Sequence, residues 1–206
     1  MPPIGPHEKR QHAARLDMDT PVFELDRETG LLGGNPCLCS PHCDDRPQGV
    51  SIDTLVIHAI SLPPGYFDTG PISDLFLGCL DADAHPYFRE VATLKVSAHF
   101  VIGRNGDVTQ FVPVTRRAWH AGESWFDGRD RVNDFSVGVE LVGSDDTRFT
   151  DSQYVVLANL TRGLQKAWPA ITSDRIVGHS EIAPGRKTDP GPHFDWDRYR
   201  RLIPAA

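Results

Sequence analysis

The segment Ile176–Gly191 constrains the fold more than any other stretch of the sequence. It places His179 directly after a short apolar, β-branched run and Asp189 ten residues later, among Pro and Gly residues that force a loop. A histidine at a strand end and a carboxylate on the following loop can bind one metal ion, and catalytic zinc commonly takes three protein ligands and a water. The third ligand must come from another part of the chain.

The best candidate for this third ligand is His58, at the end of the run Asp53–His58. The run is almost continuously apolar, as expected for a central strand that is buried on both faces. We expect the strand to stop at His58, ahead of the Pro-Pro-Gly sequence that follows. His99 and His120 lie in strand-like surroundings as well, so spacing alone leaves them as competitors for the metal.

Together with a metal site, two further charged residues would supply the catalytic groups of a metal-assisted amide hydrolase. Glu140 lies among apolar neighbours in a predicted strand, Phe135–Val142, and Lys187 lies on the loop after His179. A glutamate beside the metal can take the proton of a metal-activated water, and a lysine can stabilise the oxyanion that forms at a carbonyl. Taken singly, each residue has an ordinary structural explanation, such as a paired carboxylate or a solvated surface charge.

Periodicity and capping signals predict the remaining elements and a single α/β domain over residues 23–206, with a mixed central β-sheet flanked by helices. Residues 1–22 are polar and without period, so we expect a disordered N-terminal arm there. Residues 33–50 are predicted to form a loop. Helices are expected over residues 72–80, from the capping box Thr150–Gln153 to Pro169, and from Asp195 to about residue 203, and a β-hairpin is expected to pair residues 96–102 with 108–112 around Asn105-Gly106.

Charge and hydropathy restrict the classes of partner. A net charge of −7 and an isoelectric point near 5.7 argue against nucleic acid as a main partner. No apolar stretch reaches the length needed to span a bilayer, and the N-terminus lacks the apolar core of a signal peptide. We therefore expect a cytoplasmic monomer without a membrane partner, whose cysteines at positions 37, 39, 43 and 79 are reduced thiols.

Six motifs occur in one order along the chain. They are Val56–Gly65, Asp83–Phe88, Val96–Phe100, Arg117–Gly122, Asn133–Glu140 and Gly178–Gly191. Together they resemble the zinc N-acetylmuramoyl-L-alanine amidases, and most closely the cytoplasmic AmpD-type 1,6-anhydro-N-acetylmuramyl-L-alanine amidases. The resemblance covers roughly residues 23 to 203, and a fold like that of the amidases and peptidoglycan-recognition proteins is therefore expected.

The resemblance implies hydrolysis of the amide between the lactyl group of (1,6-anhydro-)N-acetylmuramic acid and L-Ala of a muropeptide, in peptidoglycan recycling. It implies zinc as the cofactor. Its site residues would be the zinc ligands His58, His179 and Asp189, the catalytic residues Glu140 and Lys187, and the substrate-binding residues Trp119, Arg131, Lys95 and His120.

Three positions depart from the family pattern without touching the proposed ligands. Ala59 stands where these enzymes usually carry Asn, Lys95 where they carry Arg, and Gly185 where they carry Glu. Two other functions remain open on the sequence alone. One is a non-catalytic peptidoglycan-binding module on the same fold, which typically lacks a zinc ligand. The other is a wall-degrading amidase that acts on intact peptidoglycan.

Overall fold

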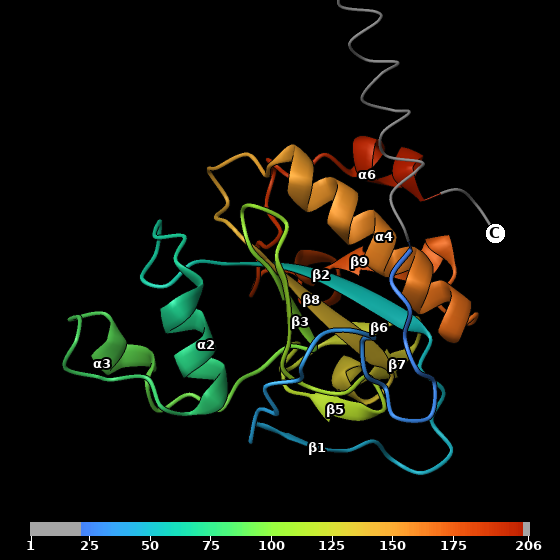
Figure 1. The fold of residues 1–206 in the computed structure, drawn as a ribbon, viewed down its shortest axis with the longest axis horizontal. Coiled ribbons are helices and arrows are strands. Elements are labelled where there is room, and N and C mark those ends of the chain that lie inside the picture. Colours follow the sequence, from blue (N-terminus) through green and yellow to red (C-terminus); the bar gives the residue numbers. More distant parts are fainter. Residues whose placement is uncertain (1–21, 204–206) are drawn as a thin grey trace, which may run out of the picture.

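A five-stranded mixed sheet forms the centre of the protein (Figure 1), whose computed structural model describes residues 22–203. The predicted N-terminal arm therefore lies outside the described residues except for Val22. The strand order is β4-β3-β8-β2-β9, and all neighbours are parallel except β3 and β4. The strands are β2 (Thr54–Ile60), β3 (Phe100–Ile102), β4 (Val108–Gln110), β8 (Ser136–Val142) and β9 (Ile176–Gly178). The predicted α/β class with a mixed central sheet is confirmed.

Helices α4 (Asp151–Ala167) and α6 (Trp196–Leu202) cover one face of this sheet (Figure 1). They pack on alternate residues of the two central strands, including Leu55 and Ile57 of β2. Both helices begin where the sequence predicts. Thr150 and Gln153 form a complete capping box at the start of α4, and Asp195 caps α6 by accepting a hydrogen bond from the Arg198 amide.

The opposite face of β2 and β8 carries the polar residues. In this parallel pair His58 lies directly beside Glu140, and because side chains alternate along a strand, both point away from α4. The expectation that β2 stops at His58 is wrong, since the strand stays paired with β8 as far as Ile60. Ala59 consequently lies within the strand and packs against the core under α4, while also lining the cavity described below.

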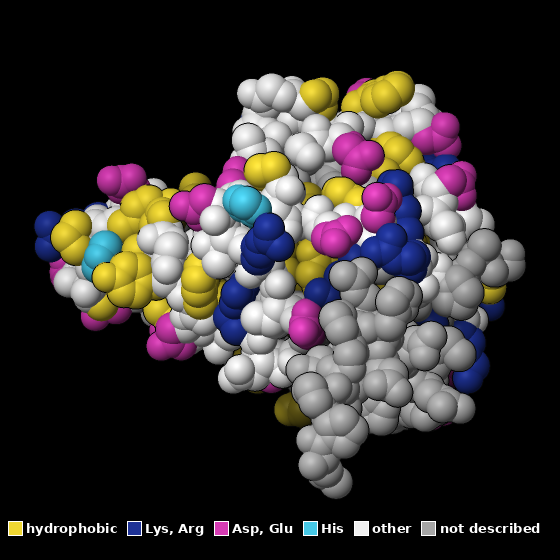
Figure 2. Space-filling view, turned by 90° about the horizontal axis from the view of Figure 1, so that it is seen from above, with side chains coloured by type: hydrophobic (Ala, Val, Ile, Leu, Met, Phe, Trp, Pro, Cys, Tyr) yellow, Lys and Arg dark blue, Asp and Glu magenta, His cyan; other side chains and the backbone are white. Residues whose placement is uncertain are grey.

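Helix α2 (Thr69–Leu77) and the short helix α3 (Phe88–Val91) project to one side of the sheet (Figure 1). Helix α2 begins three residues earlier and ends three residues earlier than the predicted span of residues 72–80. Its end is set by Gly78, which follows the last helical residue in a left-handed conformation with φ of 71°. Hydrophobic side chains gather on the surface of this projection (Figure 2). Tyr66, shortly before α2, and Leu94, shortly after α3, are large exposed hydrophobic residues.

Two small antiparallel sheets complete the framework of the site on the face away from α4. Strand β1 (Cys43–Asp45), within the predicted loop, pairs with β5 (Arg116–Ala118), and β6 (Trp125–Phe126) pairs with β7 (Arg129–Asp130). The predicted hairpin forms as β3 and β4, although β3 begins only at Phe100. Within residues 22–203 no helix is long and apolar enough to cross a membrane. The remaining short elements are η1 (Val132–Asp134), η2 (Ser173–Arg175) and α5 (His179–Ile182).

Candidate metal centre and active-site cavity

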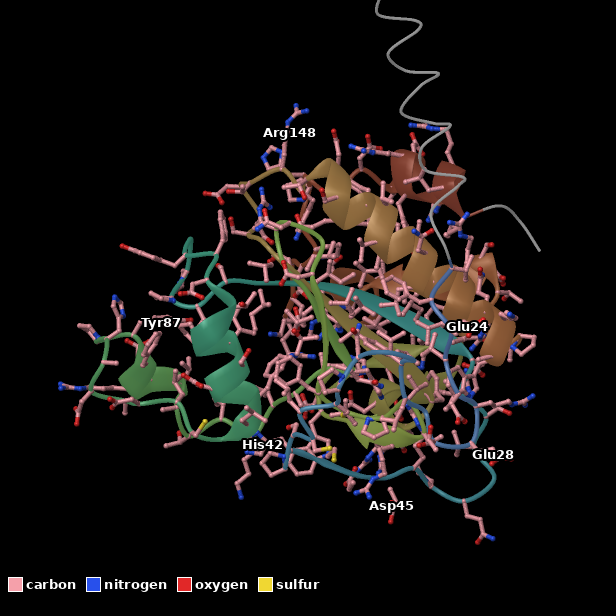
Figure 3. The ribbon with its side chains drawn as sticks, viewed as in Figure 1. Glu24, Glu28, His42, Asp45, Tyr87 and Arg148 are labelled. Atoms are coloured by element: carbon pink, nitrogen blue, oxygen red, sulfur yellow. The ribbon has the colours of Figure 1, made fainter. Side chains whose placement is uncertain are left out.

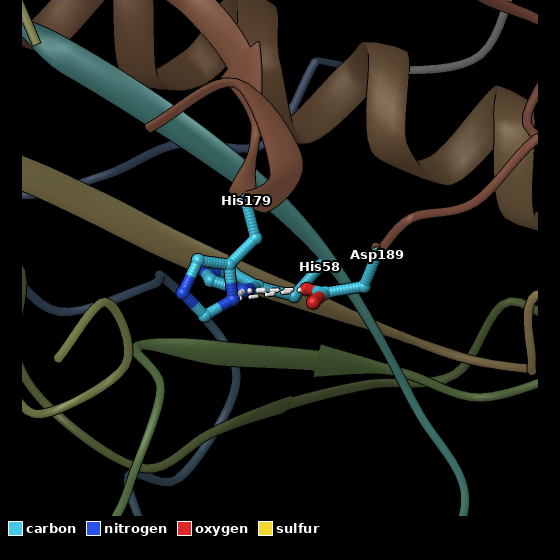
Figure 4. A group of neighbouring side chains, drawn as sticks. All are labelled: His58, His179 and Asp189. Carbon is cyan, nitrogen blue, oxygen red and sulfur yellow. Dashed lines mark hydrogen bonds and ion pairs between the residues drawn. The ribbon is translucent and has the colours of Figure 1, made fainter. Parts of the chain in front are cut away.

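His58, His179 and Asp189 converge on one point (Figure 4). The two Nδ1 atoms of the histidines lie 3.0 Å apart, and Asp189 Oδ2 lies 3.0 Å from His58 Nδ1 and 3.1 Å from His179 Nδ1. Among residues 22–203 these three form the group of His, Cys, Asp and Glu side chains that can hold a metal ion. The three side chains that the sequence analysis selected are thus brought together.

The fold supplies the three side chains from adjacent places. His58 lies near the carboxyl end of β2, and His179 follows β9, the parallel neighbour of β2, as the first residue of the one-turn helix α5. Asp189 lies on the loop that follows α5. The Ser180 amide donates to the Asp189 carbonyl oxygen at 3.0 Å, which folds this loop back over the strand ends.

The hydrogen bonds on the far sides of the two rings determine what the converging atoms can do. His179 Nε2 faces the Ala121 carbonyl oxygen at 3.1 Å, and since a carbonyl only accepts, the proton of a neutral His179 is on Nε2. His58 Nε2 lies 2.9 Å from His120 Nδ1. When the proton of His58 is likewise on Nε2, His120 Nδ1 accepts a hydrogen bond from it. Both Nδ1 atoms then present lone pairs toward the Asp189 carboxylate, an arrangement that fits a cation.

The ionisation states agree with a cation site. Burial lowers the pKa of His58 to about 4, against the opposing effect of Asp189, so the ring is neutral at pH 7 as a ligand must be. Burial raises the pKa of Asp189, but its close contacts with His179 and His58 outweigh that effect and hold the pKa well below its usual range. Two neutral imidazoles and one carboxylate are a typical donor set for zinc.

Glu140 lies beside this centre and is almost completely buried. Burial raises the pKa of Glu140 well above its usual range, the charge of Asp189 raises it further, and Lys187 opposes both effects. Its Oε2 atom has no hydrogen-bond partner in the part of the chain that the structure describes. A buried, unpaired carboxylate oxygen is costly for folding alone, so its retention beside a cation site indicates a chemical role.

A cavity of about 260 Å³ opens onto two of the three converging residues, His179 and Asp189. One wall is polar and includes Glu140, His179 and Asp189, and the exposed Lys187 lies at its edge. The facing wall is largely apolar and comes from the projection that carries α2 and α3. Its residues include Leu62, Leu75, Phe76, Tyr87, Val91 and Leu94.

The structure divides the four residues expected at the substrate. Trp119 and His120 both line the cavity. Lys95 lies between two lining residues, Leu94 and Val96, without lining the cavity itself. Arg131 is exposed in a separate hollow formed with residues 122–124 and 130, where its Nε lies 3.3 Å from Asp134.

The two competing histidines have other partners. His120 supports His58 from behind and also lies 3.2 Å from Ser136 Oγ through its Nε2 atom. His99 is fully buried, accepts a hydrogen bond from the Gly138 amide and faces the Arg116 carbonyl oxygen, away from the converging atoms.

A family model described as N-acetylmuramoyl-L-alanine amidase matches residues 48–192, which include every member of the converging group. The chain belongs to this amidase family. It is 53% identical to the 1,6-anhydro-N-acetylmuramyl-L-alanine amidase AmpD of Haemophilus influenzae over 174 residues, which cover 84% of this chain and 95% of that protein. Identity to the Escherichia coli AmpD is 51% over 176 residues, covering 85% and 96% of the two chains.

Solved amidase structures share the fold. A crystal structure of an AmpD selenomethionine derivative superposes with a TM-score of 0.83 at 50% identity and covers 87% of this chain and 99% of its own. The E. coli amidase AmiD, solved with anhydro-N-acetylmuramic acid-L-Ala-D-γ-Glu-L-Lys, gives a TM-score of 0.56 at 28% identity, over 78% of this chain and 62% of that one.

Sequence reasoning missed the residues that support the amidase centre from behind. Ser136 and Gly138 precede Glu140 on the same face of β8, and a Cβ atom at Gly138 would lie 2.4 Å from the His120 ring. A glycine inside an otherwise strong strand pattern is the signal that predicts such a close approach. The carbonyl oxygen of Ala121 carries no sequence signal, because any residue supplies one.

Proposed function

We propose that this protein is a zinc-dependent amidase that hydrolyses the amide between the lactyl group of 1,6-anhydro-N-acetylmuramic acid and L-Ala of the stem peptide, in peptidoglycan recycling. One observation carries the proposal. Three ligand atoms converge beside a buried, unpartnered glutamate oxygen in a chain about half identical to AmpD enzymes. We further propose that the protein acts as a cytoplasmic monomer on released muropeptides.

His58, His179 and Asp189 would hold the zinc through Nδ1, Nδ1 and Oδ2. Zinc, when bound, supplies a Lewis acid that polarises the scissile carbonyl and lowers the pKa of a water. Each ligand residue makes a second contact that fixes its position. His58 contacts His120, His179 contacts the Ala121 carbonyl oxygen, and the backbone carbonyl of Asp189 accepts from the Ser180 amide. Such contacts hold ligands in the productive orientation and tautomer.

Glu140 would act as the general base. Its carboxylate adjoins the converging ligands from the neighbouring strand, and its raised pKa makes it a stronger proton acceptor than an exposed glutamate. After taking the proton of the attacking water, it can deliver that proton to the departing L-Ala amine. Lys187 at the cavity edge would stabilise the negative charge that develops on the carbonyl oxygen of the scissile lactyl amide.

The substrate would lie in the cavity between these groups and the apolar wall. Trp119 offers a ring face in the cavity wall, and Lys95, next to two lining residues, offers positive charge for the carboxylates of the stem peptide. Arg131 would offer a further positive charge from its separate hollow. His120, whose two ring nitrogens face His58 and Ser136, would act on the metal site rather than on the substrate.

A cleavage assay distinguishes this function from the two alternatives. The purified protein is incubated with anhydro-muropeptide and, separately, with intact sacculi, before and after zinc removal by a chelator and zinc readdition. We expect release of stem peptide from the muropeptide, its loss with chelator and its recovery with zinc. Cleavage of sacculi alone would favour a wall-degrading amidase, and binding without cleavage would favour a recognition module.

A further inference from the structure

Trp119 is held in the cavity wall by contacts on three sides. Its indole Nε1–H donates to Asp44 Oδ1 at 3.1 Å, and its backbone amide donates to Ser97 Oγ at 3.1 Å. The ring of His42 stacks on the indole with a centroid separation of 6.1 Å and an angle of 14° between the planes. Of these contacts, the bond to Asp44 is the hydrogen bond that sets the direction of the indole ring.

Asp44 is itself fixed by Arg117. It lies on β1 opposite Arg117 of β5, and its carboxylate accepts from Arg117 Nε at 2.6 Å and from the NH2 group at 2.5 Å. This two-bond geometry is typical of an arginine paired with a carboxylate and fixes both side chains. Figure 3 places the neighbouring residues His42 and Asp45 along the β1 segment below the sheet, with His42 next to the base of α2.

The same arginine reaches the other side of the site. Arg117 donates to Asp134 at 2.5 Å, and Asp134 pairs with Arg131 at 3.3 Å. A continuous chain of charged contacts therefore joins Arg131, Asp134, Arg117, Asp44 and the indole of Trp119. The chain connects two of the residues proposed to contact the substrate, Trp119 and Arg131, although they lie in separate hollows.

We infer that Asp44 is a positioning residue for the substrate, which acts by holding the indole of Trp119 in the cavity wall. The inference rests on the proposed amidase function. An aromatic ring that is already fixed loses little conformational freedom when a substrate packs against it, so preorganisation strengthens binding without changing the chemical step. Loss of Asp44 should therefore raise KM and leave kcat and zinc content unchanged.

The test compares Asp44→Ala with Asp44→Asn and with the control Asp45→Ala. Asn keeps an oxygen acceptor for the indole N–H, whereas Ala removes it. Asp45 lies on the same strand and pairs with Arg116 at 3.2 Å, but its side chain is 87% exposed and is not a partner of Trp119. Asp44→Ala should raise KM for an anhydro-muropeptide by about three- to tenfold, Asp44→Asn should restore much of it, and Asp45→Ala should match the wild type.

A second readout does not depend on activity. The indole N–H signal of Trp119 in a ¹⁵N–¹H NMR spectrum, assigned from its absence in Trp119→Phe, should shift in Asp44→Ala and remain close to its original position in Asp45→Ala. In the Trp119→Phe background, Asp44→Ala should have no further effect on KM. An unchanged KM, an unmoved signal, or an equal KM increase in the Phe background would overturn the inference. If the wild type cleaves no muropeptide, the proposed function fails, while the NMR comparison still decides whether Asp44 positions Trp119.

Discussion

Replacing His120 with alanine should weaken zinc binding although His120 is not one of the converging ligands. In the wild type, His58 Nε2 lies 2.9 Å from His120 Nδ1, and both side chains are buried. Alanine removes the acceptor and leaves the His58 N–H without a partner whenever Nδ1 faces the metal. The ring of His58 then also loses the contact that selects this tautomer.

The magnitude follows from the burial of the orphaned donor. An unsatisfied buried donor costs about 1–3 kcal/mol, and since about 1.4 kcal/mol corresponds to a factor of ten, the dissociation constant for zinc should rise by roughly five- to 150-fold. The loss of an outer partner of a metal-binding histidine typically weakens metal affinity about 10- to 100-fold. The two estimates agree, and we expect a rise of about 10- to 100-fold.

The measurement is a zinc titration of metal-free protein in competition with a chromophoric chelator, with circular dichroism to confirm folding. His120→Asn is the matched variant, because its Oδ1 lies close to the position of the imidazole Nδ1 and can still accept from His58. His99→Ala is the control for removal of a buried histidine. The ring nitrogens of His99 contact the Gly138 amide, the Arg116 carbonyl oxygen and the Arg46 side chain, and none of these belongs to a proposed ligand. A wild-type zinc affinity in folded His120→Ala would refute the reasoning.

Three further outcomes are expected. Gly138→Ala should weaken zinc binding as His120→Ala does, because its Cβ would lie 2.4 Å from the His120 ring; an unchanged affinity in the same titration would show that the ring can move aside. Glu140→Gln should keep its zinc, measured by metal analysis, and lose about 10²-fold or more in kcat, whereas a kcat near wild type would make Glu140 structural. For Asp53, burial raises the pKa, but hydrogen bonds from Arg129, Thr54 and Arg175 outweigh it and lower the pKa below its usual value. Its stabilisation is therefore present above the unfolded-state pKa and is lost as pH falls through the folded-state pKa. Asp53→Asn should therefore unfold at a lower temperature than wild type at pH 7, with the difference narrowing toward pH 3, and a difference independent of pH would contradict this assignment.

Local sequence signals are sufficient to predict the helices whose capping residues lie within the helix ends themselves. The capping box at Thr150 and the cap at Asp195 begin α4 and α6 as expected, because capping depends on residues within one turn. The buried strand before His58 and the Pro- and Gly-rich loop before Asp189 were also readable, and the three residues of the candidate metal centre come together as the sequence predicted.

The sequence does not predict the ends of strands and helices where these depend on residues far along the chain. Strand β2 continues past His58 because β8 offers pairing partners as far as Val142, 84 positions further along the chain than His58. Helix α2 ends at Gly78 although apolar spacing continues through Cys79 and Leu80, since the left-handed Gly78 redirects the chain. His99 and His120 look equivalent in sequence, and only packing shows that His120 alone contacts a proposed ligand.

The register between β2 and β8 couples the proposed metal site to the proposed general base. Ser136, Gly138 and Glu140 occupy alternate positions of β8 and therefore share the face that carries His58. Ser136 contacts the far side of His120, Gly138 leaves the space that the ring fills, and Glu140 lies beside the ligands. A shift of one residue would replace all three with the apolar side chains that now pack under α4. The support of His58 and the proposed base therefore depend on a single pairing, so substitutions that loosen β8 should lower zinc affinity and kcat together, whereas Glu140→Gln separates them.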